Sequence, residues 1–142
     1  MILPDVNLLL YAHNSASLEH AAAREWWERQ LNSTQPVALC WVAINGFIRI
    51  STHPRIFQKP LSSKEATLCV KDWLVQSNVL IIEPGFKFQN IYLDYIEKLG
   101  TAGNLTTDAY LAALAVEHQA ELQSNDSDFE KFSGLRWRNP MK

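Results

Sequence analysis

The sequence predicts an α/β protein in which helices cover both faces of a mainly parallel sheet of four to five strands. Short apolar segments alternate along the chain with helical segments of roughly ten residues or more. This alternation is typical of β-α-β units, whose crossover helices make neighbouring strands parallel. The 142 residues are close to the usual size of one domain. We therefore expect residues 1–142 to form a single three-layer α/β/α domain.

The composition excludes a disordered chain and a membrane span. Hydrophobic residues make up 47% and charged residues 20% of the chain, and no apolar run approaches the ~18 residues that a spanning helix needs. The net charge is -2, so a nucleic-acid partner would need a local basic patch. The N-terminus lacks the basic segment of a secretory signal, and Cys40 and Cys69 stand in apolar stretches that suit reduced, buried thiols. We therefore expect a cytoplasmic protein.

The first half of the chain contains two of the expected strands and three of the expected helices. Ser17 is the candidate N-cap of the second helix, because Glu19 follows in the first turn. Asn45 and Arg49 are four residues apart in the third helix and share one of its faces. The expected strands are residues 2–3 and 37–40, and the expected helices are residues 6–11, 18–31 and 41–50.

The second half continues the same alternation. Ser62 and Glu65 match a capping box, and Thr107 is a candidate N-cap. The helix after Thr107 is apolar on nearly every face, so it must pack between neighbouring elements. The expected helices are residues 63–77, 88–99 and 108–119, with a helical turn at 128–132, and the expected strands are residues 79–82, 121–123 and 135–137.

Acidic residues follow two strands and open one helix. Asp5 follows the first strand, Asp126 and Asp128 follow the fourth, and Asp108 begins the buried helix. In parallel sheets, sites form beyond the carboxyl ends of the strands. Carboxylates that converge there repel one another unless a cation joins them, and oxygen ligands without His or Cys favour Mg²⁺ or Mn²⁺, which suit phosphodiester hydrolysis. The alternative is that each acid only caps a helix or forms a turn.

Three segments that carry these acids resemble the acidic motifs of PIN-domain ribonucleases. Taken together and in their order along the chain, the three segments are most similar to those of the VapC-type toxins of bacterial toxin–antitoxin pairs. Two further segments resemble one branch of that group, so the likeness covers nearly the whole chain. The motif segments are residues 5–7, 107–115 and 124–129, and the further segments are residues 46–57 and 134–137.

The resemblance implies a PIN-like fold and a metal-dependent endoribonuclease that a small VapB-like antitoxin neutralises. Asp5, Asp108 and Asp126 match the acids that bind Mg²⁺ or Mn²⁺ and carry catalysis in the family, with Asp128 as an acid in the outer shell. Polar neighbours are expected to support these acids. The supporting residues are Asn7, Asn45, Arg49, Thr107 and Ser124.

One position departs from the family pattern. The Glu of the family's Glu-Phe-x-Arg motif falls on Gly46, and Asn45 beside it carries no charge. A site with three carboxylates should bind Mg²⁺ more weakly than one with four, or rely on more water ligands. Gly46 reflects either drift or a role in a close approach of the backbone to the substrate. Arg49 on the same face is expected to aim its guanidinium at phosphate, unless it is an ordinary solvated arginine.

Two other functions remain as alternatives. Without the family's Glu, the chain is either an active enzyme or a weakened PIN-like module that binds RNA or a protein without cleaving. A phosphatase-like hydrolase with Asp5 as covalent nucleophile is disfavoured, because position 7 is Asn where that chemistry needs a second acid.

The partner surface is expected on the second helix. Trp26 and Trp27 belong to an apolar arc of about 180°, wider than the ~100° stripe that one core contact requires. One tryptophan is therefore expected to contact an antitoxin or a second protomer of a homodimer, unless both pack between neighbouring elements. Basic residues are expected to hold phosphates beside the acids, namely Arg55, Lys59, Arg136, Arg138 and Lys142.

Overall fold

Five short parallel strands form the centre of the computed structural model, which describes residues 1–142. Every neighbouring pair of strands is parallel, and the order across the sheet is β3-β2-β1-β4-β5. The predicted parallel sheet is therefore confirmed, with five strands. Their bounds are β1 (Ile2–Pro4), β2 (Val37–Leu39), β3 (Val79–Ile81), β4 (Glu121–Gln123) and β5 (Trp137–Arg138).

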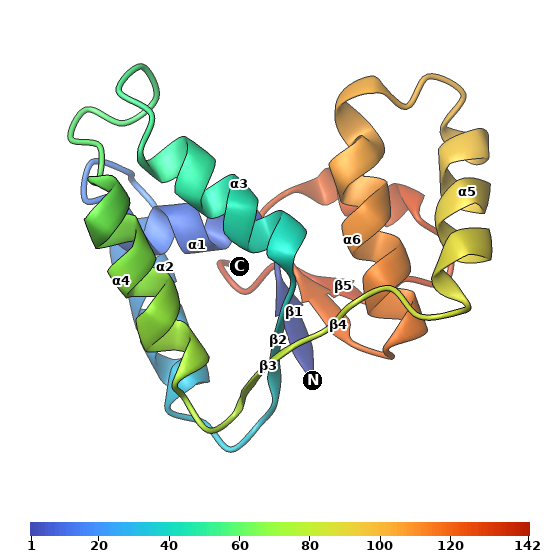
Figure 1. Cartoon of the computed structure of the whole chain (residues 1–142). Coiled ribbons are helices and arrows are strands. Elements are labelled where there is room, and N and C mark those ends of the chain that lie inside the picture. Colours follow the sequence, from blue (N-terminus) through green and yellow to red (C-terminus); the bar gives the residue numbers. More distant parts are fainter.

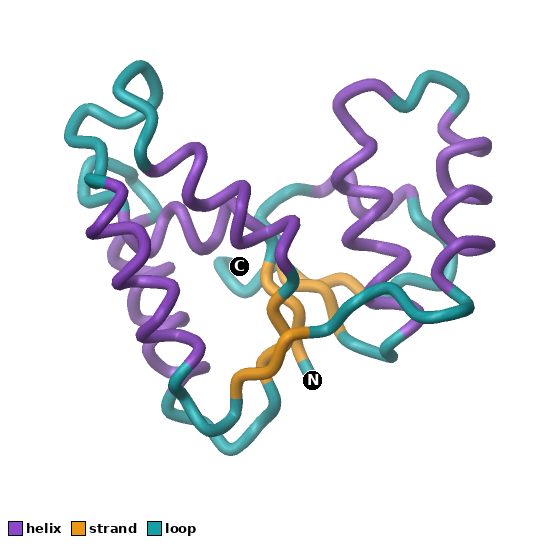
Figure 2. Tube along the Cα trace, viewed as in Figure 1, coloured by secondary structure: helices purple, strands orange, loops and turns teal.

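Six α-helices flank this sheet. Helices α1 to α4 lie on one side of it, and α5 and α6 lie on the other (Figure 1). The strands are confined to the middle of the molecule, and helices make up most of its regular structure (Figure 2). The bounds are α1 (Val6–His13), α2 (His20–Leu31), α3 (Trp41–Ser51), α4 (Ser63–Leu74), α5 (Phe88–Leu99) and α6 (Thr106–Glu117).

Alternation along the strands divides the interior into two cores. Ile2 packs with α1 to α4, whereas its neighbour Leu3 packs with α5 and α6. On β2, Val37 and Leu39 face the first core and Ala38 faces the second. Successive side chains of a strand point to opposite faces, so a sheet covered on both sides is apolar throughout. This explains the continuous apolar runs in the sequence.

The two predicted N-caps Ser17 and Thr107 are wrong. The Ser17 hydroxyl accepts a hydrogen bond from the backbone amide of Glu19 (3.2 Å) and donates one to its carboxylate (2.6 Å), so it closes the turn before α2. A 3-10 turn over Gly103–Leu105 runs directly into α6, so Thr107 lies inside the helix. The capping box of Ser62 and Glu65 is confirmed, with both hydrogen bonds at 3.0 Å.

The remaining expectations about the chain hold with small shifts of boundary. Helix α4 ends three residues before the predicted limit, and the last strand lies at 137–138, where the backbone carbonyls of Arg136 and Arg138 accept from β4 and from Ser124. Cys40 and Cys69 are both free, and only Cys40 is fully buried. None of the helices combines the length and the apolar character needed to cross a bilayer.

Candidate metal centre

Three acids lie together beyond one edge of the sheet. Asp5 directly follows β1, and Asp126 follows β4, which pairs with β1. Asp108 lies in the first turn of α6. All three line one cavity of ≈ 430 Å³. The structure therefore brings these three side chains together as predicted from the order of the elements, because the carboxyl ends of parallel strands meet at one edge.

The same cavity has a polar rim and an apolar wall. The expected polar residues Asn7, Asn45, Arg49 and Thr107 line it, so the face shared by Asn45 and Arg49 points toward the acids. The apolar wall was not predicted from the sequence. The sequence contains a signal for this wall in the spacing of its apolar residues. They are four residues apart on α1 and eight apart on α3, and both spacings are typical of one helix face. The wall consists of Val6, Leu10, Val42 and Ile50.

Ser124 connects the acids beneath the cavity. Its side chain is fully buried, and its hydroxyl donates to Oδ2 of Asp5 at 2.7 Å. The Ser124 hydroxyl oxygen also accepts hydrogen bonds from Nδ2 of Asn7 (3.2 Å) and from the backbone amide of Asp126 (3.0 Å). Ser124 thus fixes the relative positions of β1, α1 and the loop after β4. The Oδ1 atom of Asn7 is buried without a hydrogen-bond partner.

Asp5 is a buried carboxylate with a perturbed affinity for protons. Burial raises its pKa above the usual value, and hydrogen bonds from Ser124 and from the backbone amide of Val6 (2.7 Å) oppose that rise. The negative charge of Asp126 raises the pKa further. Asp5 also caps α1, so the partial positive charge of that helix end faces its carboxylate.

Asp108 is the acid most strongly affected by its neighbours. Partial burial is the largest cause, and the charges of Asp5, Asp126 and Asp128 add to it, so the pKa of Asp108 rises from 3.8 to about 7. Lys131 opposes this shift. Such mutual repulsion is expected where carboxylates converge without a cation.

Three acids, not the same three, form a cluster of closely spaced carboxylates. Oxygens of Asp108, Asp126 and Asp128 lie within 4.8 Å of one another. Asp128 is therefore a member of this cluster, whereas its expected role was in the outer shell. Asp5, which Ser124 holds, is not a member of it. The backbone amide of Asp128 donates to Asp126 (2.9 Å), and Lys131 lies 3.5 Å from Asp128. Converging hard oxygen donors without His or Cys fit Mg²⁺ or Mn²⁺.

Gly46 allows two helices to approach closely. A Cβ at this position would lie 3.2 Å from Cγ2 of Val6, which is tighter than ordinary van der Waals contact. Gly46 also lines the acid cavity. The close approach seen here is between α3 and α1, whereas the expected approach of the backbone to the substrate stays a prediction.

The expectation of an exposed tryptophan on α2 is wrong. Trp26 and Trp27 are only 2% and 3% exposed. Trp26 donates its indole N–H to Oε1 of Gln123 (2.9 Å), and Trp27 packs edge-on against Trp73 of α4 with ring centroids 5.6 Å apart. The wide apolar arc exists because α2 packs mainly against α1 and also contacts Trp73 of α4 through Trp27. Two packing partners need twice the apolar surface of one.

Of the expected basic residues, Arg49 alone lines the acid cavity. Arg136 and Arg138 instead line a second cavity, together with Arg29 of α2. The spacing of residues could not show which cavity Arg136 and Arg138 would line, because the two ends of a short strand are close together in sequence.

These features together define a class of α/β proteins with a carboxylate centre beyond the parallel sheet. The PIN domain model matches residues 2–135. Ribonuclease VapC33 of Mycobacterium tuberculosis is 41% identical over 142 residues, covering 100% of this chain and 99% of that protein. Ribonuclease VapC37 of the same species is 38% identical over 99% of this chain and 97% of that protein. The chain belongs to the PIN domain family, in its VapC group.

Solved structures agree on the fold. The VapBC2 structure from Rickettsia felis, described as bound to a DNA fragment from the promoter, has a TM-score of 0.70 at 19% identity and covers 98% of each chain. VapC20 of Mycobacterium tuberculosis, described as a Sarcin-Ricin loop cleaving toxin, has a TM-score of 0.65 at 13% identity, covering 96% of this chain and 99% of that one. At these identities the likeness concerns the fold alone.

Proposed function

We propose that this protein is a metal-dependent endoribonuclease that acts as the toxin of a toxin–antitoxin pair. One observation carries the proposal: the acids that follow β1 and β4 and the acid that opens α6 line a single cavity. Relatives that match almost the full length of the chain are named ribonucleases. Hydrolysis of a phosphodiester bond is the chemistry that such a carboxylate centre suits best.

Asp5, Asp108 and Asp126 would hold Mg²⁺ or Mn²⁺, with Asp128 within reach of the same centre. When bound, the cation supplies a Lewis acid for the phosphoryl group and lowers the pKa of a water molecule. Asp108 favours this role because burial and the charges of the neighbouring acids raise its pKa to about 7, and a divalent cation would relieve the repulsion.

The chain's own residues would position the RNA. Arg49 lines the cavity and would bind the phosphate through its planar guanidinium, stabilising the charge that develops there. Asn45 and Thr107 offer hydrogen bonds at the rim. Ser124 and Asn7 would act as positioning residues, because the Ser124 hydroxyl orients Asp5 and is itself held by Asn7.

Cleavage of total RNA tests the proposal. Wild-type protein should cleave RNA with Mg²⁺ or Mn²⁺ and lose this activity in EDTA, and an Asp126→Asn variant should be inactive. Asp94→Asn is the matched control, because Asp94 pairs with Lys98 on the surface of α5, outside the cavity. Equal activity of Asp126→Asn and Asp94→Asn would refute the assignment, and comparison of the two metals identifies the preferred ion.

A non-cleaving PIN-like module is the second candidate, favoured by the absence of the family's Glu at Gly46. Such a module would retain RNA in a filter-binding assay at any metal concentration and release no shorter products. Metal-dependent product formation that Asp126→Asn abolishes would exclude it.

We further propose three properties of the cellular context. A small VapB-like antitoxin would neutralise the protein, since its relatives belong to the VapC group.

A homodimer is supported by exposed apolar side chains on α3, the loop before α5 and α5 itself, and light scattering of the purified chain tests it. These side chains are Trp41, Phe86 and Leu93. The two free cysteines are consistent with a cytoplasmic location.

A further inference from the structure

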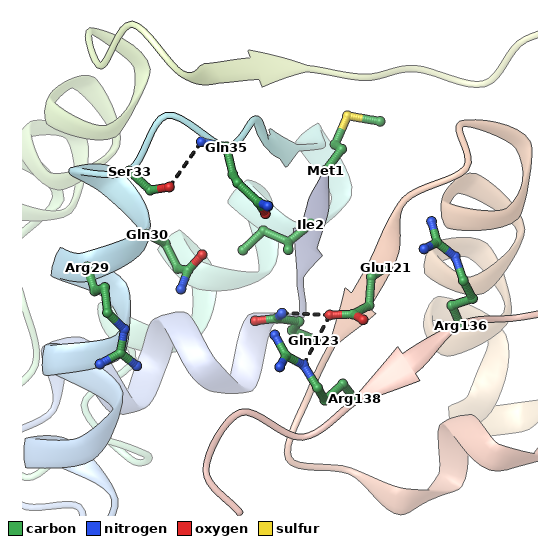
Figure 3. Close-up of a pocket in the computed structure, with 10 residues that line it drawn as sticks. All are labelled: Met1, Ile2, Arg29, Gln30, Ser33, Gln35, Glu121, Gln123, Arg136 and Arg138. Atoms are coloured by element: carbon green, nitrogen blue, oxygen red, sulfur yellow. Dashed lines mark hydrogen bonds and ion pairs between the residues drawn. The ribbon is translucent and has the colours of Figure 1, made fainter.

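A second cavity of ≈ 590 Å³ lies between α2 and the strands β4 and β5 (Figure 3). It shares no lining residue with the acid cavity. Its walls are strongly polar, and only Met1 and Ile2 are hydrophobic. The polar lining residues are Arg29, Gln30, Ser33, Gln35, Glu121, Gln123, Arg136 and Arg138.

The polar lining departs from the pattern of the rest of the sheet. Leu122 of β4 and Trp137 of β5 pack into the core beside α5 and α6. Their neighbours Glu121, Gln123 and Arg138 point to the other face and line the cavity. Parallel sheets are normally buried on both faces by apolar contacts. Charged side chains on this half of the face therefore suit a polar occupant.

A hydrogen-bonded chain fixes one wall of the cavity. Trp26 donates to Oε1 of Gln123 (2.9 Å), and Nε2 of Gln123 donates to Oε1 of Glu121 (2.8 Å). The same carboxylate oxygen accepts from Nε of Arg138 at 3.2 Å (Figure 3). Gln123 is fully buried, so this network holds Glu121 and Arg138 in place before any ligand arrives.

The guanidinium groups retain free donors. Arg138 uses Nε for Glu121, and no protein group bonds its two terminal nitrogens. The nearest carboxylate oxygen of Glu25 lies 3.7 Å from Arg29, beyond a hydrogen bond, while Arg136 donates one bond to the carbonyl of Gln119 (2.7 Å). Three guanidinium groups against the single lining carboxylate give a positive site, and their fork-shaped donor geometry matches phosphate.

We propose that this arginine recess binds a backbone phosphate of RNA, at a point separate from the acid cavity. The inference rests on the proposed ribonuclease function and extends it to the binding of the RNA strand. β4 joins the two regions, since Gln123 lines the recess and Ser124 beside it holds Asp5. An apolar peptide is poorly suited to the recess, because only two of its lining residues are hydrophobic. Arginine clusters also recognise acidic peptides, so an acidic peptide is included in the test below.

RNA binding in EDTA tests the proposal without cleavage. Fluorescence anisotropy of a labelled single-stranded RNA should show several-fold weaker binding at low salt for Arg29→Gln and for Arg138→Gln. The slope of log K against log salt should fall in magnitude by about 0.7 per lost phosphate contact. Arg24→Gln is the matched control: Arg24 also lies on α2, forms an i,i+4 pair with a Glu and is 64% exposed, against 62% for Arg29, but lies outside the recess. Equal effects of Arg24→Gln and Arg29→Gln would overturn the proposal.

The indole N–H of Trp26 reports directly on occupancy, because it bonds Gln123 in the recess wall. Its ¹H–¹⁵N signal, assigned with Trp26→Phe, should shift when RNA is added to wild-type protein and stay unchanged in Arg138→Gln. A shift caused by inorganic phosphate or by an acidic peptide, but not by RNA, would overturn the assignment to RNA and identify that other ligand. If RNA is bound as expected yet never cleaved with metal, the ribonuclease proposal fails while the phosphate site remains.

Discussion

Single side chains decide how the acid cavity behaves. Asp108 has a pKa of about 7 because it is partly buried and faces three other carboxylates. Asp5 keeps its place through one hydroxyl, that of Ser124. Gly46 lets α3 approach α1 because it has no Cβ atom, which in any other residue would lie close to Val6. Each of these effects predicts the outcome of a substitution.

The charge of Asp108 destabilises the metal-free protein. Its pKa is raised in the folded state, so the fold binds the proton more tightly than the unfolded chain does, and stability decreases as pH rises from about 4 to about 7. Asp108→Asn removes this penalty. At pH 8 without metal, we expect the variant to be more stable by on the order of 1–2 kcal/mol, a value reduced because solvent screens a half-exposed carboxyl.

Urea unfolding from pH 4 to pH 8 measures this difference, and the variant's stability should depend less on pH than that of the wild type. RNA cleavage by the variant should be lost in the same preparation. A variant that is less stable than wild type at pH 8, or fully active, contradicts the role assigned to Asp108.

Gly46 and Val6 should be energetically coupled. Gly46→Ala gains about 1 kcal/mol of helix propensity but places a Cβ 3.2 Å from Cγ2 of Val6. In a Val6→Ala background that contact disappears. We expect Gly46→Ala to be more favourable by about 0.5–1 kcal/mol in the Val6→Ala background than in the wild type. Unfolding free energies of the four proteins of this cycle measure the coupling, and additive effects would show that the close approach carries no strain.

At the scale of secondary structure, contacts between elements position the ends of the helices. The sequence signals for N-caps at Ser17 and Thr107 were overridden by turns that lead into α2 and α6. Helix α5 begins at a loop whose conformation depends on a distant side chain. The carboxylate of Glu117, at the end of α6, accepts from the backbone amides of Gly85 (2.7 Å), Lys87 (3.0 Å) and Phe88 (3.0 Å).

Glu117→Gln should weaken the attachment of α5 to α6. The side chain is only 8% exposed, and an amide offers one acceptor oxygen where the carboxylate offers two. We expect a loss of about 1–3 kcal/mol in unfolding free energy, the usual cost of leaving buried donors unpaired. Glu97→Gln, an exposed change on α5, is the control and should be nearly neutral. Equal stability of the two variants in urea would show that the three hydrogen bonds contribute little.

For the whole molecule, the acid cavity joins segments far apart in the chain. The residue after β1, the loop after β4 and helix α6 each contribute one acid, so a cation bound there would connect both cores. Ligands that bind only the folded state stabilise it by mass action. The arginine recess lies elsewhere on the same sheet, between α2 and β4–β5 (Figure 3).

Mn²⁺ should therefore raise the thermal midpoint. At a hundredfold excess over Kd the gain is about 2.7 kcal/mol, or on the order of 5–10 °C for a chain of this size. Differential scanning fluorimetry with and without Mn²⁺ measures the shift, and Asp126→Asn should show much less of it. An equal rise in both proteins would place the ion outside the acid cavity.

The sequence by itself determined the order of elements, the parallel sheet and the convergence of Asp5, Asp108 and Asp126, because strand-end positions follow from local patterns and from topology. Only the tertiary structure decided the burial of Trp26 and Trp27, the contact of Gly46 with Val6, and the location of Arg136 and Arg138 in a separate cavity. Periodicity shows which face of an element is apolar, but it does not show how many neighbours pack against that face. Burial depends on those neighbours, which come from distant parts of the chain.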